Sequence, residues 1–98
     1  MDIVKNYDGK ELTIQIKGRI DTVTAPDFEN EINDEIGKFD SLILDFTDLE
    51  YISSAGLRVI TAIDIEMSKK EGMVLKNVCP DVMDVLELTG LSDDLTFI

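Results

Sequence analysis

The chain has 98 residues, of which nine are basic and 21 acidic, so its net charge is −12. This length suits one domain over residues 1–98, and 44% hydrophobic with 31% charged residues is typical of a soluble globular protein. The charge argues against nucleic acid and anionic membrane as direct partners, since phosphate groups repel such a surface. It serves either solubility or a face that docks on a basic partner.

Missing residue types narrow the function further. No histidine is present, so neither a Ser-His-Asp nor a Cys-His catalytic site can be assembled, and we expect no enzyme activity. The single cysteine, Cys79, excludes an internal disulfide and a cysteine metal cluster. We expect no metal and no cofactor. The chain shows neither a secretion signal nor a segment apolar enough to span a membrane, which indicates a cytoplasmic protein.

The first 20 residues predict a β-hairpin. Apolar residues alternate with polar ones across residues 11–17, the pattern of a half-buried strand whose inner residues are Leu12, Ile14 and Ile16. We expect residues 2–7 to pair with this strand through a turn at Asp8-Gly9. Residues 18–21 are expected to end the second strand.

A helix is predicted next. Thr24 suits the N-cap, Pro26 the first turn, and Asp27 the acid of a capping box. Gly37 is expected to end the helix. Its core-facing stripe consists of Phe28, Ile32 and Ile36.

The second half alternates strands and helices. Residues 41–46 are nearly all apolar, which predicts a strand covered on both faces. A long helix is predicted from Leu57 to about Lys70, before a stop at Gly72, then a strand from residue 73, a helix from Pro80 to Gly90, and a short final strand. The long helix has a core-facing stripe of Gly56, Ile60, Ile63 and Met67.

The resulting order, ββαβαβαβ, predicts an α/β fold with a small mixed sheet of four to five strands and three or four helices. Strands that alternate with helices imply parallel crossovers. In so small a sheet, the helices should pack mainly against one side.

The stretch DLEYISSAGLR (residues 48–58) joins a predicted strand to the long helix. One of the two serines, Ser53 or Ser54, should cap the helix. A helix N-terminus also favours an anion, so a serine there suits phosphorylation. Gly56 removes a side chain that would keep a partner's backbone at a distance. A serine nucleophile is not expected, because no histidine can serve as its base.

Other polar and sulfur-containing residues have simpler interpretations. Three acids near a strand end are expected to be solvated rather than to bind magnesium: Asp45, Asp48 and Glu50. Three methionines are expected to fill the core: Met67, Met73 and Met83. Cys79 is expected to be a small buried hydrophobe.

Three segments carry a family resemblance: GRIDTVTAPDFE, LDFTDLEYISSAGLRVI and KNVCPDVMDVLELTGL. With the element order, they resemble the STAS domain over nearly the whole chain. They are most similar to the stand-alone bacterial anti-sigma factor antagonists, also called anti-anti-sigma factors. The resemblance implies a STAS-type fold.

The resemblance also implies a partner switch. In this family, the unphosphorylated domain binds an anti-sigma factor that is also a GHKL-type serine kinase, which frees a sigma factor. Phosphorylation ends the binding, and a PP2C-type phosphatase restores the serine. By position, the phosphoacceptor is Ser54, two residues before Gly56, with Ser53 as the alternative. The partner-binding residues implied are Asp21, Thr22, Thr24, Ser53, Ser54, Ala55, Gly56 and Arg58.

Two departures from the family pattern bear on the assignment of Ser54 as the phosphoacceptor. Ser53 stands where many members have aspartate, and Ala55 where many have a second serine or threonine. Ser54 stays the better acceptor, but a member that has lost phosphorylation fits the same residues. Arg58, one turn after Ser54, either contacts the phosphate or is simply solvated. The alternative function is a STAS interaction module in a partner-switching, chemosensory or transport assembly without sigma-factor output.

Overall fold

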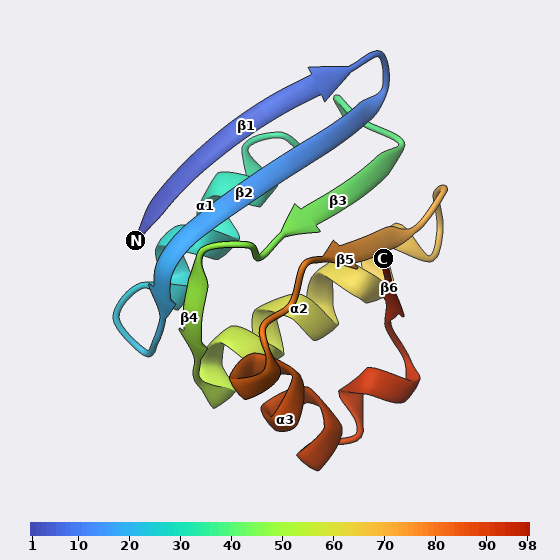
Figure 1. The fold of residues 1–98 in the computed structure, drawn as a ribbon. Coiled ribbons are helices and arrows are strands. Elements are labelled where there is room, and N and C mark those ends of the chain that lie inside the picture. Colours follow the sequence, from blue (N-terminus) through green and yellow to red (C-terminus); the bar gives the residue numbers. More distant parts are fainter.

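The computed structural model describes residues 1–98 as six strands, three α-helices and one 3₁₀ turn (Figure 1). The strands are β1 (Asp2–Asp8), β2 (Glu11–Ile20), β3 (Ser41–Asp45), β4 (Leu49–Ile52), β5 (Met73–Lys76) and β6 (Thr96–Phe97). The helices are α1 (Ala25–Asn33), α2 (Ser54–Met67) and α3 (Pro80–Leu88), followed by the 3₁₀ turn η1 (Leu91–Asp93). The predicted α/β class is confirmed, with one strand, β4, beyond the four to five expected.

The predicted N-terminal hairpin is confirmed, with its turn at Gly9-Lys10, one residue later than expected. β1 and β2 pair antiparallel from Asp2↔Lys17 to Asp8↔Glu11, and the turn between them contains Gly9 at φ +60°. An L-residue adopts this left-handed conformation only at a cost, so glycine suits the turn. The three inward residues of β2, Leu12, Ile14 and Ile16, are completely buried.

The sheet runs in the order β1-β2-β3-β5-β6, and β4 joins it beside the far end of β2. All pairs except β1–β2 are parallel. On one edge, β2 therefore pairs with two strands, with β3 through residues 11–15 and with β4 through residues 18–20. A register shift at Gly18, whose φ is +97°, separates the two halves. β2 ends at Ile20, within the predicted range of residues 18–21, and the bulge lies just before that end.

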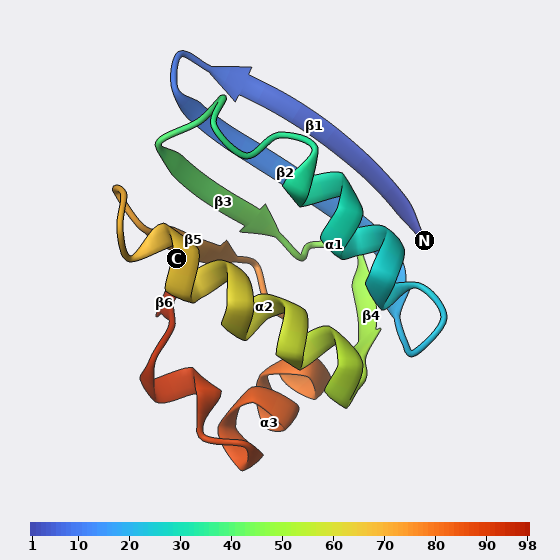
Figure 2. The same ribbon diagram turned by 180° about the vertical axis from the view of Figure 1, so that it is seen from behind.

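Two of the three helices, α1 and α2, lie on one side of the sheet, which agrees with the prediction that the helices pack mainly against one side. Figure 2 shows α1 and α2 in front of the strands, whereas in Figure 1 the opposite face is open and α3 lies beyond the end of the sheet. β3 reflects this arrangement, because Leu42 and Leu44 are buried while Ile43 between them is only half-buried. The expectation that residues 41–46 are covered on both faces is therefore wrong.

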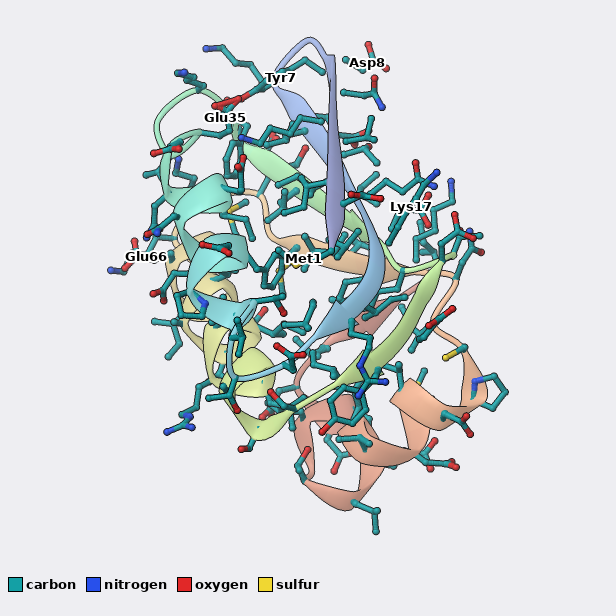
Figure 3. The ribbon with its side chains drawn as sticks, turned by 90° about the vertical axis from the view of Figure 1, so that its left-hand side faces the viewer. Met1, Tyr7, Asp8, Lys17, Glu35 and Glu66 are labelled. Carbon is teal, nitrogen blue, oxygen red and sulfur yellow. The ribbon has the colours of Figure 1, made fainter.

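Helix α1 is shorter than predicted. Pro26 stands in its first turn, but the helix ends at Asn33 rather than Gly37, and Ile36 is 42% exposed. Asn33 and Asp34 are poor helix formers, since their side chains compete with the backbone for hydrogen bonds. Two contacts hold the helix and its C-terminal turn against the edge strand. One joins Lys5 Nζ to Glu31 Oε2 at 2.6 Å. In the other, the Tyr7 hydroxyl donates to Glu35 Oε1 at 3.1 Å (Figure 3).

The other two helices follow the predicted patterns more closely. The α2 stripe is buried, and α3 begins at Pro80 and is followed by Gly90 at φ +79°. Thr89, the residue that follows α3, is exposed. The hydrophobic core contains 23 buried residues, including Met67 and Met73, while Met83 and Cys79 are only partly buried. No helix combines the length and apolar character needed to cross a membrane.

Candidate functional site

Ser53 caps helix α2. Its backbone is extended, at φ −94° and ψ 173°, and its Oγ accepts a hydrogen bond from the backbone N–H of Gly56 at 3.4 Å. The Ser53 carbonyl accepts from the N–H of Leu57 at 2.9 Å, the first hydrogen bond of the helix. The prediction that one of the two serines is the cap is confirmed, and the cap is Ser53.

Ser54 is the first residue of α2 and is exposed to solvent. Because Ser53 provides the cap, the hydroxyl of Ser54 is not required for helix stability. The first turn of α2 contains no acidic residue. An anion on Ser54 therefore meets the positive end of the helix dipole without a carboxylate in the same turn to repel it.

Gly56 is buried, and the side it leaves empty faces the core. A Cβ at this position would lie 2.7 Å from Ile20 Cγ2 and 2.7 Å from Ile52 Cγ1. The glycine therefore lets the start of α2 press against the ends of β2 and β4. The expectation that Gly56 admits a partner's backbone is wrong, since a side chain at this position would point into the core rather than toward a partner.

Asp21 organises the loop between β2 and α1. Its Oδ1 accepts hydrogen bonds from the backbone N–H groups of Val23 at 3.0 Å and Thr24 at 2.9 Å. The Thr24 hydroxyl donates to the carbonyl of Arg19 at 2.9 Å and accepts from the N–H of Asp21 at 2.8 Å. Thr24 precedes α1 but makes no side-chain cap, so the predicted capping box with Asp27 does not form.

These hydrogen bonds shift the ionisation of the Asp21 carboxyl. The backbone N–H of Thr24 is the largest cause, and the Thr24 hydroxyl, the N–H of Val23 and the charge of Arg19 act in the same direction. Together they outweigh desolvation and hold the pKa of Asp21 below its usual value. Asp21 thus carries a fixed negative charge near neutral pH.

One hydrogen bond joins this loop to the serine. The N–H of Ser53 donates to the carbonyl of Ile20 at 2.8 Å, directly before Asp21. The Asp21–Thr24 loop and the start of α2 are therefore neighbours, although Thr24 and Ser53 are 29 positions apart in the sequence. Of the predicted partner residues, Thr22, Ser54 and Arg58 are exposed, and Asp21, Thr24, Ser53 and Ala55 are partly buried.

The structure adds three surface residues that the sequence did not single out. Val23 is 80% exposed at the tip of the loop, and Tyr51 is 39% exposed on β4. The guanidinium carbon of Arg19 lies 4.2 Å from the centre of the Tyr51 ring. In the sequence, Tyr51 shortly before the two serines could have indicated an exposed aromatic residue. Its contact with Arg19 could not be predicted, because it depends on the pairing of β4 with β2.

The acids near the strand ends do not form a metal site. No group of three or more cysteine, aspartate or glutamate side chains is arranged to hold a metal ion. Asp45 instead accepts hydrogen bonds from Thr47, through both its backbone N–H and its hydroxyl.

The comparisons with known proteins identify the family of the chain. The family model described as the STAS domain matches residues 2–98. The chain belongs to the STAS domain family. A Bordetella bronchiseptica protein named "Putative anti-sigma factor antagonist BtrV" is 32% identical to this STAS chain over 77 residues. The match covers 76% of this chain but spans only 66% of that relative's length.

Solved structures show the same fold. An anti-sigma factor antagonist from Mycobacterium paratuberculosis superposes with a TM-score of 0.89 at 24% identity, covering 98% of this chain and 83% of that one. The unphosphorylated form of the anti-sigma factor antagonist SpoIIAA superposes with a TM-score of 0.83 at 20% identity, covering 99% and 88%. SpoIIAA, a Bacillus cell fate determinant, has also been solved in a phosphorylated form. At these identities, the likeness establishes the fold alone.

Proposed function

We propose that this STAS protein is an anti-sigma factor antagonist that works by partner switching. Unphosphorylated, it binds an anti-sigma factor that is also a GHKL-type serine kinase, and so frees a sigma factor. The kinase phosphorylates Ser54, the complex separates, and a PP2C-type phosphatase resets the serine. All of these steps would take place in the cytoplasm, without a catalytic group from this chain.

The observation that carries the proposal is that the two serines have different structural roles. Ser53 is engaged as the helix cap, whereas Ser54 is exposed at the first residue of α2. A kinase needs an accessible hydroxyl whose modification does not unfold its substrate. Ser54 meets both needs, whereas Ser53 is partly buried and its Oγ is engaged by the Gly56 N–H, which makes it the less accessible acceptor.

The position of Ser54 also explains how one phosphate could act as a switch. Phosphorylation adds about −1.5 to −2 charges. In the free protein, the helix N-terminus favours this charge by about 0.3–1 kcal/mol. Beneath a closely fitted partner, an unpaired charge costs about 3–5 kcal/mol, which corresponds to an affinity loss of two to three orders of magnitude or more.

The surroundings of Ser54 provide a surface for the partner. Asp21 has a fixed negative charge, and Val23 presents an apolar side chain beside it. Interfaces commonly combine an apolar contact with charged groups that set orientation. The names of the relatives, which include anti-sigma factor antagonists, support a partner of the anti-sigma factor type.

The test uses the purified chain with candidate GHKL-type anti-sigma kinases, ATP and magnesium. We expect mass spectrometry to place one phosphate on Ser54. We expect Ser54→Ala to abolish phosphorylation, and Ser53→Ala to retain it. Complex formation, measured by calorimetry, should be lost with Ser54→Asp and kept with Ser54→Ala. A complex that survives Ser54→Asp would instead support a STAS interaction module without this switch.

A further inference from the structure

Helix α3 presents an outer face that nothing in the chain covers. Its inner residues Val82 and Leu86 are 1% and 0% exposed, whereas Asp81, Asp84 and Leu88 form the opposite stripe at the spacing i, i+3 and i+7. Leu88 is 87% exposed, the highest value among the large hydrophobic residues exposed in the chain. Glu87 lies beside it and is exposed too.

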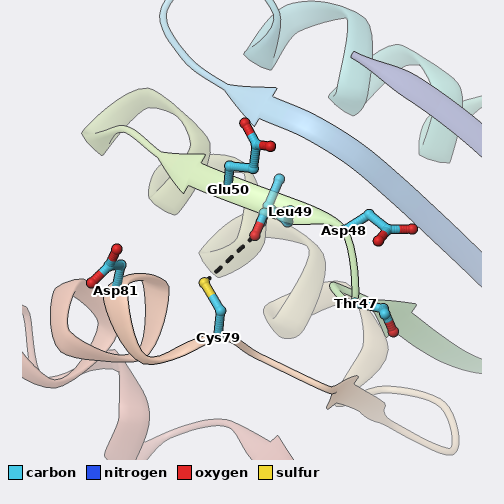
Figure 4. A pocket seen from close by; sticks show the side chains of 6 residues that line it. All are labelled: Thr47, Asp48, Leu49, Glu50, Cys79 and Asp81. Carbon is cyan, nitrogen blue, oxygen red and sulfur yellow. Dashed lines mark hydrogen bonds between the residues drawn. The ribbon is translucent and has the colours of Figure 1, made fainter.

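A hollow of about 400 Å³ adjoins the start of this stripe (Figure 4). Leu49 and Cys79 contribute its apolar lining, and the Cys79 thiol donates to the Leu49 carbonyl at 3.5 Å. Three acidic residues are among those that line the hollow: Asp48, Glu50 and Asp81. Because Asp81 belongs to both features, the hollow and the outer stripe of α3 are continuous. Together they are called the α3 surface below.

The negative charge of the α3 surface is not neutralised within the chain. No lysine or arginine follows Lys76, while five acids do: Asp81, Asp84, Glu87, Asp93 and Asp94. The three salt bridges of the structure all lie elsewhere. The surface thus combines an exposed leucine with acids that have no cationic partner.

We infer that the α3 surface is a second docking surface, for a basic amphipathic helix of a partner protein. An apolar side chain of that helix would pack on Leu88, while the stem of a lysine or arginine would enter the hollow with its charge between the carboxylates. Seven residues separate Asp81 from Leu88, which is about 10.5 Å along a helix, or two turns of a ligand helix.

The negative charge of the α3 surface favours a basic helix over other possible occupants. A second copy of the chain would bring another net charge of −12 to the same face. Nucleic acid and anionic lipid are repelled for the same reason. The surface is also distinct from the proposed phosphorylation site, because Glu50 is the residue of the hollow nearest to it in the sequence, and four residues of extended chain, about 13 Å, lead from Glu50 to Ser54.

The test titrates the ¹⁵N-labelled full chain with a designed 18-residue helical peptide that has leucines on one stripe and lysines elsewhere. A scrambled peptide of the same composition is the control for net charge. Amide shifts are expected at residues 47–50 and 79–88, with an affinity that falls as salt rises. Shifts spread over all acidic segments, or equal binding of the scrambled peptide, would overturn the inference.

Matched variants sharpen the result. Leu88→Ser and Glu87→Lys change exposed residues and should each weaken binding about fivefold to tenfold. Asp34→Lys makes the same charge change as Glu87→Lys at the exposed end of α1, and should alter affinity by less than about twofold. Equal losses from these two charge changes would mean unspecific attraction. Because Ser54 takes no part, the outcome is independent of the proposed switch.

Discussion

A Gly56→Ala substitution adds one methyl group at the tightest contact between α2 and the sheet. The new Cβ would lie 2.7 Å from Ile20 Cγ2 and from Ile52 Cγ1, and 3.2 Å from Ile52 Cδ1. Carbon atoms pack at about 3.5–4.0 Å, so the two closest contacts are short by about 0.8 Å or more. Neither close atom is the free end of a flexible chain, and both isoleucines are buried at 0% and 2% exposure.

The expected cost follows from two opposing effects. Over-packing a core costs about 1–3 kcal/mol, while alanine gains up to about 1 kcal/mol over glycine in helix propensity. We expect a net loss of about 1–2 kcal/mol in the free energy of unfolding, measured by urea denaturation followed by circular dichroism. In a chain of this size, each kcal/mol lowers Tm by about 4–8 °C.

A double-mutant cycle separates the clash from other effects of alanine. Ile52→Ala removes two of the three close atoms, so Gly56→Ala should cost at least about 1 kcal/mol less in that background. Gly9→Ala is the control, because it has no neighbour within 4 Å and should show no such coupling. If Gly56→Ala proves as stable as the wild type, the close packing of α2 on the sheet is refuted.

Four further predictions concern the serines and two aspartates. Ser53→Ala should lower the free energy of unfolding by about 0.5–1 kcal/mol in urea titrations, near the low end for a lost cap because the hydrogen bond is 3.4 Å long. Ser54→Asp should raise it by up to about 1 kcal/mol at low salt and by less at high salt; a loss of stability would contradict the helix-dipole argument. Because the pKa of Asp21 is lowered in the fold, its charge should stabilise the wild type over Asp21→Asn at neutral pH, with the difference disappearing as pH falls through the folded pKa below 3.8. Burial, and then the charge of Asp94, raise the pKa of Asp64, so Asp64→Asn should raise Tm at pH 7 and lose this advantage below about pH 3.8.

Local sequence signals predicted the parts of the fold that depend on neighbouring residues. The N-terminal hairpin, the alternation of Leu12, Ile14 and Ile16, and the proline that opens α3 each reflect a local rule, and each is confirmed, although the hairpin turn lies one residue later than predicted. The one strand that was not predicted is β4. Its four residues, LEYI, follow β3 after only three others, and its pairing depends on a bulge at Gly18 some 30 residues earlier.

In the candidate site too, local features could be predicted from the sequence, whereas tertiary contacts could not. Two adjacent serines before a helix predicted a cap, which Ser53 provides, but local pattern could not say which of the two would take that role. Gly56 was misassigned to a partner surface, because only the three-dimensional structure shows Ile20 and Ile52 on its empty side. Asp21 and Ser54 were grouped through family resemblance; the hydrogen bond from Ser53 to Ile20 provides the physical link.

The hydrogen bond between the Ser53 N–H and the Ile20 carbonyl has a consequence for how any kinase would recognise Ser54. It ties the target to a strand that belongs to a remote part of the chain, so the local conformation exists only after folding. A synthetic peptide of residues 48–60 would lack that tether and should be a poor substrate. An enzyme that reads this hydroxyl must recognise a finished tertiary structure, and it would thereby ignore nascent or damaged copies of the protein.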